Sequence, residues 1–361
     1  MKTSTAFKNA MEVIHHLSDE KPPWDAFLQT SKELVGADAT AFIMFDGEQN
    51  LDELKHSDRD SAPVREYLAH FYKYDAIAQA SCKSPAGKWW DSLELANAPD
   101  ARKLPFYADF MPRHRLGQVT ALILHAEPGR RMSVSFHRNT ARANAVEEFS
   151  RGNIRRFTDA LLLAVSARTA STLARIAGAE AALSSIDEAL FLTNRKGELV
   201  RCSAFASKLL AEAKMLSASQ GALCHPQPRL LEGMLGALTT TFLTSRPCQY
   251  CVPLSWGVGI RFDVTVAPER FRLADESLLL VRARKISAFD VPDVAELATF
   301  FGLSVAESRV LLLLVKGRSP KEIALFNGVA EPTVRNQVAS LMRKMSCTRL
   351  SELVRLGSIL R

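Results

Sequence analysis

Residues 331–345 combine side chains that can read DNA with the spacing of an α-helix. At 100° per residue, one face of this helix would be apolar, and we expect its members to be buried: Val334, Val338, Leu341 and Met345. The opposite face is polar, basic and small. In a major groove, Arg reads guanine and Asn reads adenine through paired hydrogen bonds. We therefore expect these residues to face bases: Arg335, Asn336, Ala339, Ser340 and Arg343.

Two further helices must position this one. The pairs Ser304–Glu307 and Ser319–Glu322 are capping boxes, in which the Ser side chain and the Glu side chain each bind a backbone N–H at a helix start. Gly317 and Gly328 are stop signals at the ends of these two helices. The helix that begins at Ser319 ends at Gly328, and a short turn joins it to the DNA-reading helix over 331–345. Two helices joined in this way predict a helix-turn-helix, in which the DNA-reading helix is the second helix.

The basic surplus of the chain is concentrated in the same region. The 361 residues include 46 basic and 39 acidic side chains, a net charge of +7. Residues 304–361 alone hold ten Lys and Arg against four Glu, a net charge of +6. This distribution indicates a polyanionic partner for the carboxyl-terminal block. A solvated basic face on a purely structural helix remains the alternative.

Several stretches between residues 303 and 354 resemble the LuxR-type DNA-binding domain. They are LSVAESRVL (303–311), KGRSPKEIA (316–324), GV (328–329), TVR (333–335), LMRKM (341–345) and TRLSELV (348–354). The resemblance implies a four-helix domain over 293–361 that dimerises on DNA and activates or represses transcription. It also implies that residues matching Arg335, Asn336 and Ala339 face bases.

For the DNA backbone, the resemblance and the flanking positions of the helix together give a second set of expected contacts: Thr333, Gln337, Lys344, Arg349 and Lys321. Two departures from the family pattern matter. Ala330 stands where Ser is usual, so the third helix lacks a cap worth about 1 kcal/mol. Ala339 can contact a thymine methyl group but cannot donate a hydrogen bond. The operator sequence cannot be copied from relatives.

The amino-terminal part predicts a multidomain α+β protein with sensor-like units. Helical spacing and short apolar runs alternate over 1–150, which favours a GAF-like sensor domain with these elements: helices at 7–17, 24–34 and 63–79, and strands at 39–45, 119–125 and 132–137. An apolar stripe over 151–186 predicts a connecting helix and a dimer seam, with two helices broken near Gly178 as the alternative. Residues 187–286 resemble a PAS domain by their order of strands and helices, with strands expected at 189–193, 198–202, 259–267 and 277–283 and a helix at 204–213.

A ligand pocket is expected in the first of these units. Tyr67, Asp75, Trp89 and Trp90 resemble, in order, the residues of the acyl-homoserine-lactone sensor domain, which uses aromatic residues and an Asp to clamp the lactone amide. Ala76 departs from that pattern, so a GAF-like fold fits better. For Trp89 and Trp90, packing of their loop on the sheet is the alternative to a ligand wall.

Other chemistry is not expected. Cys224, His225, Cys248 and Cys251 do not make a convincing zinc set, and the last two are better explained by a strand. No nucleophile or carboxylate pair accompanies the scattered histidines, so we expect neither an enzyme nor a cofactor or metal. Without a signal peptide or about 18 consecutive apolar residues, a cytoplasmic location is expected, with no membrane partner.

The sequence therefore predicts a sequence-specific DNA-binding transcriptional regulator that acts as a homodimer. The expected partners are double-stranded DNA, a second copy of the chain, RNA polymerase and a small-molecule effector of the amino-terminal domains. The alternative is an interaction protein whose helix-turn-helix binds another regulator rather than DNA.

Overall fold

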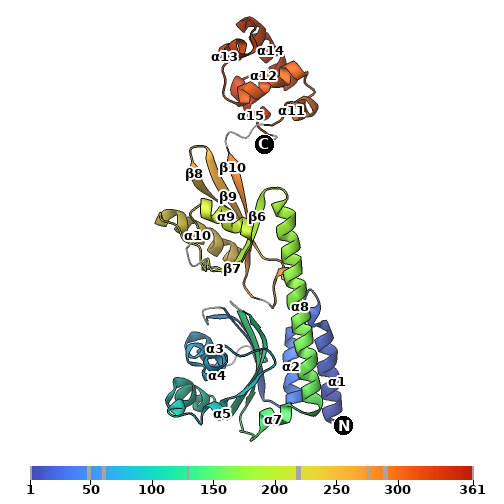
Figure 1. Ribbon diagram of the computed structural model, residues 1–361, viewed down its shortest axis with the longest axis vertical. Coiled ribbons are helices and arrows are strands. Elements are labelled where there is room, and N and C mark those ends of the chain that lie inside the picture. The colour runs from blue at the N-terminus through green and yellow to red at the C-terminus, as the bar shows by residue number, and fades with distance from the viewer. Residues whose placement is uncertain are drawn as a thin grey trace. The chain divides into compact units, whose positions relative to one another are not determined.

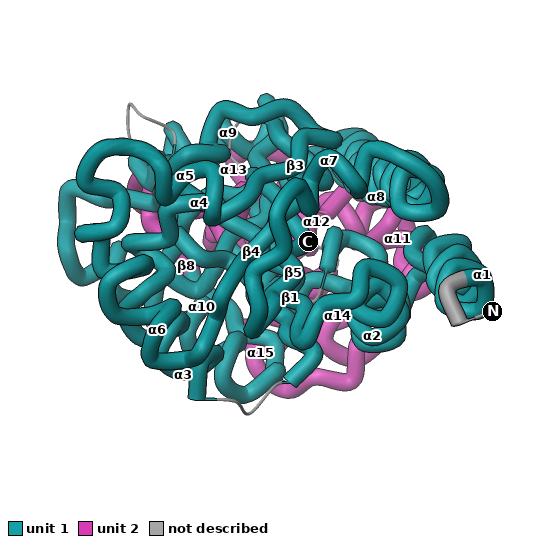
Figure 2. Tube along the Cα trace, turned by 90° about the horizontal axis from the view of Figure 1, so that it is seen from below, with its two compact units in different colours: residues 1–250, 262–283 teal, residues 251–261, 284–361 magenta. Residues whose placement is uncertain are grey.

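The computed structural model describes residues 2–46, 50–58, 62–127, 130–216, 221–274, 276–287 and 292–359. The chain forms two compact units, residues 1–250 with 262–283 and residues 251–261 with 284–361 (Figure 2). The first contains a sheet and its helices over the front third of the chain, and most of a second sheet. The second holds the carboxyl-terminal helices. This confirms the α+β fold class, with an all-α domain at the end.

The first sheet is antiparallel, with the order β2-β1-β5-β4-β3. Its strands are β1 (Ala39–Asp46), β2 (Leu51–His56), β3 (Trp89–Asp91), β4 (Gln118–Glu127) and β5 (Arg130–Arg138). One face is covered by the following helices: α1 (Lys2–His15), α2 (Trp24–Val35), α7 (Ala145–Phe149) and part of α8 (Gly152–Ser184). In Figure 1 the helices α1, α2 and α8 lie together on this side, and α3, α4 and α5 lie on the other.

Shorter helices cover the second face of this sheet. They are α3 (Ala62–Ala69), η2 (Phe71–Tyr74), α4 (Ala76–Ala80), α5 (Ser92–Leu95), η3 (Ala101–Lys103), the π-helix η4 (Phe106–Phe110) and α6 (Met111–Arg113); η1 (His16–Ser18) extends α1 on the first face. The single helix predicted over 63–79 is wrong: it is broken at His70 and again at Asp75, whose carboxylate caps α4. Neither β2 nor β3 was predicted as a strand.

Alternation along the strands separates two cores. On β1, Phe42 and Met44 pack with α1, α2 and α8, whereas Ala41, Ile43 and Phe45 pack with η4 and the helices around it. Successive side chains of a strand point to opposite faces, so β1 and β4 each contribute to both cores.

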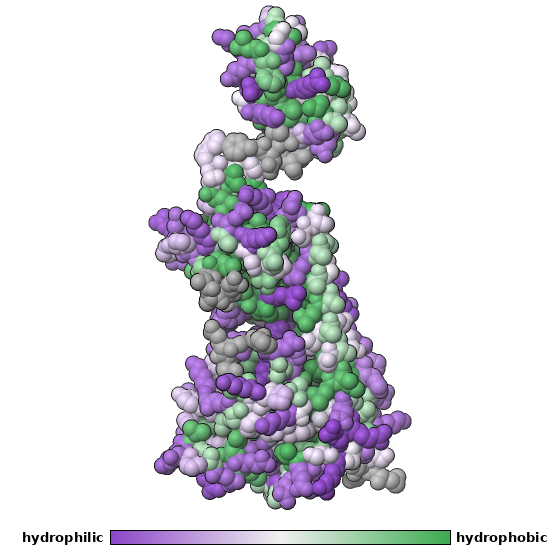
Figure 3. Space-filling model, in the orientation of Figure 1, coloured by the Kyte–Doolittle hydropathy of each residue, from purple (hydrophilic) through white to green (hydrophobic). Residues whose placement is uncertain are grey.

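The long helix α8 runs without interruption through Gly178. Its predicted apolar stripe packs within the same chain, because Phe157, Leu161, Val165 and Ile176 are all buried. The outward face is exposed and made mostly of small residues, and Figure 3 shows it in white and pale green along the upper half of the helix. Among the described residues, α8 alone is a single helix long and apolar enough to cross a membrane; 33% of its apolar window is buried. The helices Val294–Phe301 and Val305–Val315, bent by 113° at their junction, would be a second such span if they were continuous.

The second sheet repeats the strand order of the first, as β7-β6-β10-β9-β8. Its elements are β6 (Glu188–Thr193), β7 (Leu199–Cys202), α9 (Ala204–Glu212), α10 (Pro228–Thr244), β8 (Cys248–Ser255), β9 (Val258–Val266), η5 (Glu269–Phe271) and β10 (Leu279–Ser287). The strands and the helix predicted at 189–193, 198–202, 204–213, 259–267 and 277–283 are present within a few residues.

Five helices form the carboxyl-terminal domain: α11 (Val294–Phe301), α12 (Val305–Val315), α13 (Pro320–Asn327), α14 (Glu331–Lys344) and α15 (Leu350–Gly357). They enclose one apolar core, to which α12 contributes most and α14 contributes Val334, Val338 and Leu341. Gly328 ends α13 in the left-handed conformation, at φ +66°, where a side chain would be strained. The chain can therefore turn sharply into α14.

Candidate nucleic-acid interface and ligand cavity

Both predicted capping boxes are formed, and they fix the starts of α12 and α13. Ser304 Oγ accepts from the backbone N–H of Glu307 at 3.3 Å, and Glu307 Oε2 accepts from the N–H of Ser304 at 2.8 Å. Ser319 and Glu322 make the same pair of bonds at 3.3 and 2.7 Å. At α14 the cap position is Ala330, and no side-chain bond closes the helix start. Each of these features agrees with the sequence prediction.

The outer face of α14 is available to a partner. Arg335, Asn336, Ala339 and Arg343 are all exposed, and the apolar residues of the opposite face are buried. Arg335, with 72% of its side chain exposed, donates from Nε and Nη2 to Glu331 Oε1 at 3.0 and 2.7 Å. This pair lies one helical turn apart at the surface, where such pairs contribute little to stability. The guanidinium can therefore exchange Glu331 for another acceptor at small cost.

Ser340 and Lys344 have a second role that the sequence did not indicate. Ser340 Oγ donates to Glu307 Oε1 at 3.0 Å, and Lys344 Nζ donates to Glu307 Oε2 at 2.8 Å. Hydrogen bonds from Lys344 and from the Ser304 backbone lower the pKa of Glu307 to about 2. One carboxylate thus joins the start of α12 to the middle of α14. In the sequence, Glu307 is explained by its capping box with Ser304, so no local pattern indicates its contact with Ser340 and Lys344.

The other predicted backbone contacts lie around the same helix. Thr333 and Lys321 are exposed, and Gln337 is half-buried on the flank of α14. Arg349 is exposed at the start of α15, where its backbone N–H donates to Glu352 Oε2 at 3.2 Å.

A cavity of about 50 Å³ lies between the first sheet and the short helices on its second face. Its walls are mostly apolar and include Ile43, Phe45, Phe106, Phe110 and Ile123. A single water needs roughly 10–15 Å³ of such space, so the cavity has room for a small molecule.

One strand supplies half of the polar residues that line this cavity. Alternate residues of β5 line it: Arg131, Ser133, Ser135 and His137. Ser135 Oγ lies 3.0 Å from His137 Nε2. Loss of water around the ring, with His56 close by, lowers the pKa of His137 to about 3, so this ring is neutral.

The predicted pocket residues divide into two pairs. Tyr67 and Asp75 line the cavity together, and the Tyr67 hydroxyl donates to Asp75 Oδ2 at 2.7 Å. Asp75 Oδ1 accepts from the backbone N–H groups of Ile77 and Ala78 at 2.9 and 3.0 Å. Burial raises the pKa of Asp75 and of Tyr67.

Trp89 and Trp90 do not line the cavity. The Trp89 ring packs on the opposite side of the sheet, 4.7 Å from the ring of Phe149 between centroids. Trp90 Nε1 donates to Ser84 Oγ at 3.1 Å, and Lys88 Nζ lies 4.1 Å above the Trp90 ring. Both tryptophans therefore pack their segment against the sheet, which is the alternative that the sequence left open.

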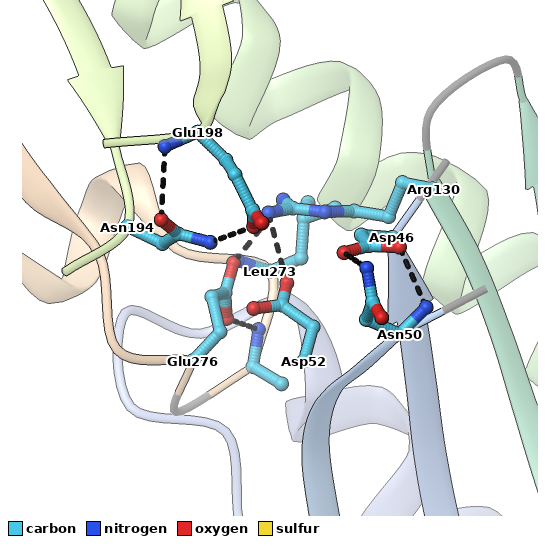
Figure 4. Close-up of polar contacts among 9 residues, drawn as sticks. Asp46, Asn50, Asp52, Arg130, Asn194, Glu198, Leu273 and Glu276 are labelled. Carbon is cyan, nitrogen blue, oxygen red and sulfur yellow. Dashed lines mark hydrogen bonds and ion pairs between the residues drawn. The ribbon is translucent and has the colours of Figure 1, made fainter. Parts of the chain in front are cut away.

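A polar joint connects the first sheet to the second (Figure 4). Arg130, at the start of β5, pairs with Asp52 of β2 at 3.3 Å and with Glu276 at 3.4 Å. Glu276 is fully buried, and it also accepts from the backbone N–H groups of Leu273 and Ala274 at 2.7 and 2.6 Å. Burial raises the pKa of Asp52. Leu273 and Ala274 belong to the core of the first domain, so the loop that Glu276 holds is part of both domains.

Arg168 of α8 is the second connection in this joint. Its guanidinium is buried and donates to four backbone carbonyls, at 2.5 Å to Leu273, 3.0 Å to Arg272, 2.6 Å to Asp19 and 3.4 Å to Leu17. Arg168 therefore connects the segment between α1 and α2, which contains Leu17 and Asp19, to the loop before β10.

The part of the chain that the structure describes contains no group of three or more metal-binding side chains. All six cysteines are free thiols, and Cys248 and Cys251 both lie on β8.

The arrangement of α12, α13 and α14 defines a helix-turn-helix domain with an exposed basic face on its third helix. Residues 302–356 match the family described as bacterial regulatory proteins, luxR family. The carboxyl-terminal domain is therefore a LuxR-type DNA-binding domain, and the chain carries the features of a transcription regulator.

No curated protein matches the chain. Solved structures that match part of the chain include the VqsR LBD domain from Pseudomonas aeruginosa, 13% identical, with a match that covers 44% of this chain and 93% of that one at a TM-score of 0.36. The N-acylhomoserine lactone dependent LuxR family factor CepR2 from Burkholderia cenocepacia is 11% identical and covers 47% of this chain and 99% of its own, with a TM-score of 0.35. A phycoerythrobilin-bound GAF domain from a cyanobacterial phytochrome is 11% identical and covers 46% and 96%, with a TM-score of 0.26.

Proposed function

We propose that this protein is a sequence-specific transcriptional regulator that binds double-stranded DNA as a homodimer in the cytoplasm. The observation that carries the proposal is the exposed basic face of α14 within a helix-turn-helix that matches the luxR family. Helix α14 enters the major groove, and its register on DNA is held by contacts from the flanking helices to the backbone.

Within this proposal the residues of the interface have distinct roles. Arg335, Asn336, Ala339 and Arg343 contact base edges. Contacts to phosphates come from the following residues: Lys321, Thr333, Gln337, Lys344 and Arg349. Ser340 is a positioning residue, because its hydroxyl is donated to Glu307. Lys344 can serve both Glu307 and a phosphate, because 44% of its side chain remains exposed.

The front domains supply the signal in this proposal. The cavity lined by Tyr67, Asp75 and β5 binds a small-molecule effector, and the joint around Glu276 and Arg168 carries its effect to the rest of the chain. RNA polymerase is the partner through which a regulator bound at an operator alters transcription. The three regions 1–150, 187–286 and 293–361 are the sensor, PAS-like and DNA-binding domains, and 151–186 is the connecting helix.

The test is selection of binding sites from a random DNA pool by the full-length protein at several salt concentrations. We expect an enriched palindromic motif, because two recognition helices related by two-fold symmetry read inverted half-sites. Affinity should fall steeply as salt rises, because phosphate contacts release counterions. Uniform weak binding at every salt concentration, with no enriched motif, would favour the interaction-protein alternative.

A single substitution sharpens this test. Arg335→Ala should weaken binding to the selected site by about 1–3 kcal/mol and relax the preference at one base pair. Arg309→Ala is the matched control, since Arg309 is an exposed arginine of α12 away from the outer face of α14. Equal effects of the two variants would contradict base reading by Arg335. Sedimentation of the full-length protein, with and without operator, tests the homodimer.

A further inference from the structure

Arg131 is a buried cation in the wall of the cavity. Only 5% of the residue is exposed, and it lies on β5 among the groups that line the cavity. Its guanidinium carbon is 5.0 Å from the centre of the Phe45 ring, which supports one face of the group. Burying a charged group is costly unless it is paired and fully hydrogen-bonded.

The protein satisfies only one side of this guanidinium. Nη1 donates to the backbone oxygen of Ala78 at 2.7 Å and to Ser81 Oγ at 3.1 Å. Nε is buried and has no hydrogen-bond partner among the residues that the structure describes. Over the same residues, no carboxylate lies within ion-pair distance of Arg131.

The nearest acid of the cavity does not fill this place. Asp75 lowers the energy of the Arg131 cation through its charge, but its oxygens already accept from the Tyr67 hydroxyl and from two backbone N–H groups. The side of Arg131 that carries Nε therefore remains without an acceptor.

The remaining donors fit a carboxylate. Nε and the neighbouring Nη2 form a planar fork whose two N–H groups match the two oxygens of a carboxylate, and such pairs are shorter and stronger than neutral hydrogen bonds. The rest of the wall is mostly apolar, and the volume of about 50 Å³ admits only a compact molecule. A phosphate or a sugar would leave more oxygens than Arg131, Ser133 and Ser135 can bind.

We propose that the cavity binds a small carboxylic acid in its ionised form, with the carboxylate on the Nε side of Arg131 and the hydrocarbon part against Ile43, Phe106 and Phe110. Ser133, the next residue of β5 on the same face, donates to the same carboxylate. The inference rests on the effector role proposed for this cavity, and it names the chemical class of the effector.

The test compares acids with their uncharged isosteres on the full-length protein. Thermal unfolding and titration calorimetry are measured with straight-chain carboxylates from butanoate to hexanoate, and with the primary amides of the same lengths. At neutral pH we expect at least one acid to bind about ten-fold or more tightly than its amide, since the amide offers Arg131 neither the negative charge nor the second acceptor oxygen. Absence of binding by every acid at millimolar concentration, or equal binding of acid and amide, would overturn the proposal.

Two variants assign the preference to Arg131. Arg131→Gln should abolish the difference between acid and amide, and Arg131→Lys, which keeps the charge but loses the fork, should retain part of it. Arg102→Gln, at a surface position outside the cavity, is the control and should bind as the wild type does. Acid preference that survives in Arg131→Gln would overturn the assignment. The comparison of acid with amide on the wild type needs no variant, so it holds even if Arg131→Gln fails to fold.

This outcome is independent of DNA binding. Selective binding of an acid without an enriched DNA motif would leave the cavity assignment standing and contradict the regulator. An enriched motif without selective binding of any acid would support the regulator and contradict the cavity assignment.

Discussion

Replacing Glu307 by Gln should loosen the contact between α12 and α14 without removing the helices themselves. The carboxylate accepts from Lys344 Nζ, Ser340 Oγ and the Ser304 backbone N–H, all within 3.0 Å. Gln keeps one acceptor oxygen, so two of these bonds are lost or weakened. The Lys344 pair is partly exposed and contributes about 0.5–1 kcal/mol. The bond from the part-buried Ser304 backbone N–H contributes about 1 kcal/mol. The expected loss is about 2 kcal/mol.

Hydrogen exchange of the full-length protein, followed by mass spectrometry, measures this loss where it occurs. A loss of about 2 kcal/mol should speed exchange of the protected amides of α12 and α14 about thirty-fold, because each 1.4 kcal/mol is a factor of ten. Glu322→Gln is the matched control: Glu322 closes the equivalent capping box of α13, and within the part of the chain that the structure describes its hydrogen bonds all go to Ser319. If Glu307→Gln affects α14 no more than Glu322→Gln does, the cross-helix role of Glu307 is refuted.

The same carboxylate should make the domain sensitive to acid. Hydrogen bonds from Lys344 and Ser304 lower the pKa of Glu307 in the folded chain to about 2, below its ordinary value of 4.5. The unfolded chain therefore binds more protons than the folded chain between these values, so the contribution of Glu307 is present above pH 4.5 and is lost as pH falls towards 2. The difference in exchange between the wild type and Glu307→Gln should shrink over that interval. A difference that stays constant from neutral pH to pH 2.5 would contradict the assignment.

Four other substitutions test the positions of single residues. Ala330→Ser should stabilise the carboxyl-terminal domain by about 0.5–1 kcal/mol in hydrogen exchange, because it supplies the cap that α14 lacks. Arg168→Met should lower the free energy of unfolding measured in urea by about 3 kcal/mol and speed hydrogen exchange in the loop before β10. The reason is that four backbone carbonyls lose the guanidinium that donates to all of them. Gly117→Ala should lower the unfolding temperature and reduce the free energy of unfolding by about 1–3 kcal/mol, because the new Cβ would lie 2.5 Å from a backbone oxygen and force the backbone to move. Gly178→Ala is its control: Gly178 has open space around it, so the substitution should be neutral or stabilising.

The carboxyl-terminal domain could be predicted from the sequence because its signals are local. Each capping box spans four residues, Gly328 marks its own left-handed turn, and the buried side of α14 follows from a repeat within fifteen residues. The contact of Ser340 and Lys344 with Glu307 joins residues more than thirty positions apart. No local pattern reports which of two polar neighbours on a helix will turn inward, so that contact could not be predicted.

The joint shows the same limit over a longer distance. Arg130 and Glu276 are separated by 146 residues, and Arg168 reaches carbonyls more than a hundred residues away in both directions. In the sequence, each is an unremarkable charged residue. The buried end of Glu276 depends on a loop of the second domain that enters the core of the first, and only the folded chain places that loop.

The sequence did not indicate the cavity, because the alternation of polar and apolar residues along β5 has two opposite explanations. Along β5, the polar residues Arg131, Ser133 and Ser135 alternate with Met132 and Val134, and such alternation usually marks a strand with one face in the core and one in water. In this sheet both faces are covered, since α1, α2 and α8 pack on one and the short helices on the other. The polar face of β5 is therefore turned into the protein, where it lines the cavity and includes the buried Arg131, whose Nε has no partner among the described residues. The proposed binding site rests on that reversal rather than on the aromatic residues of the preceding loop.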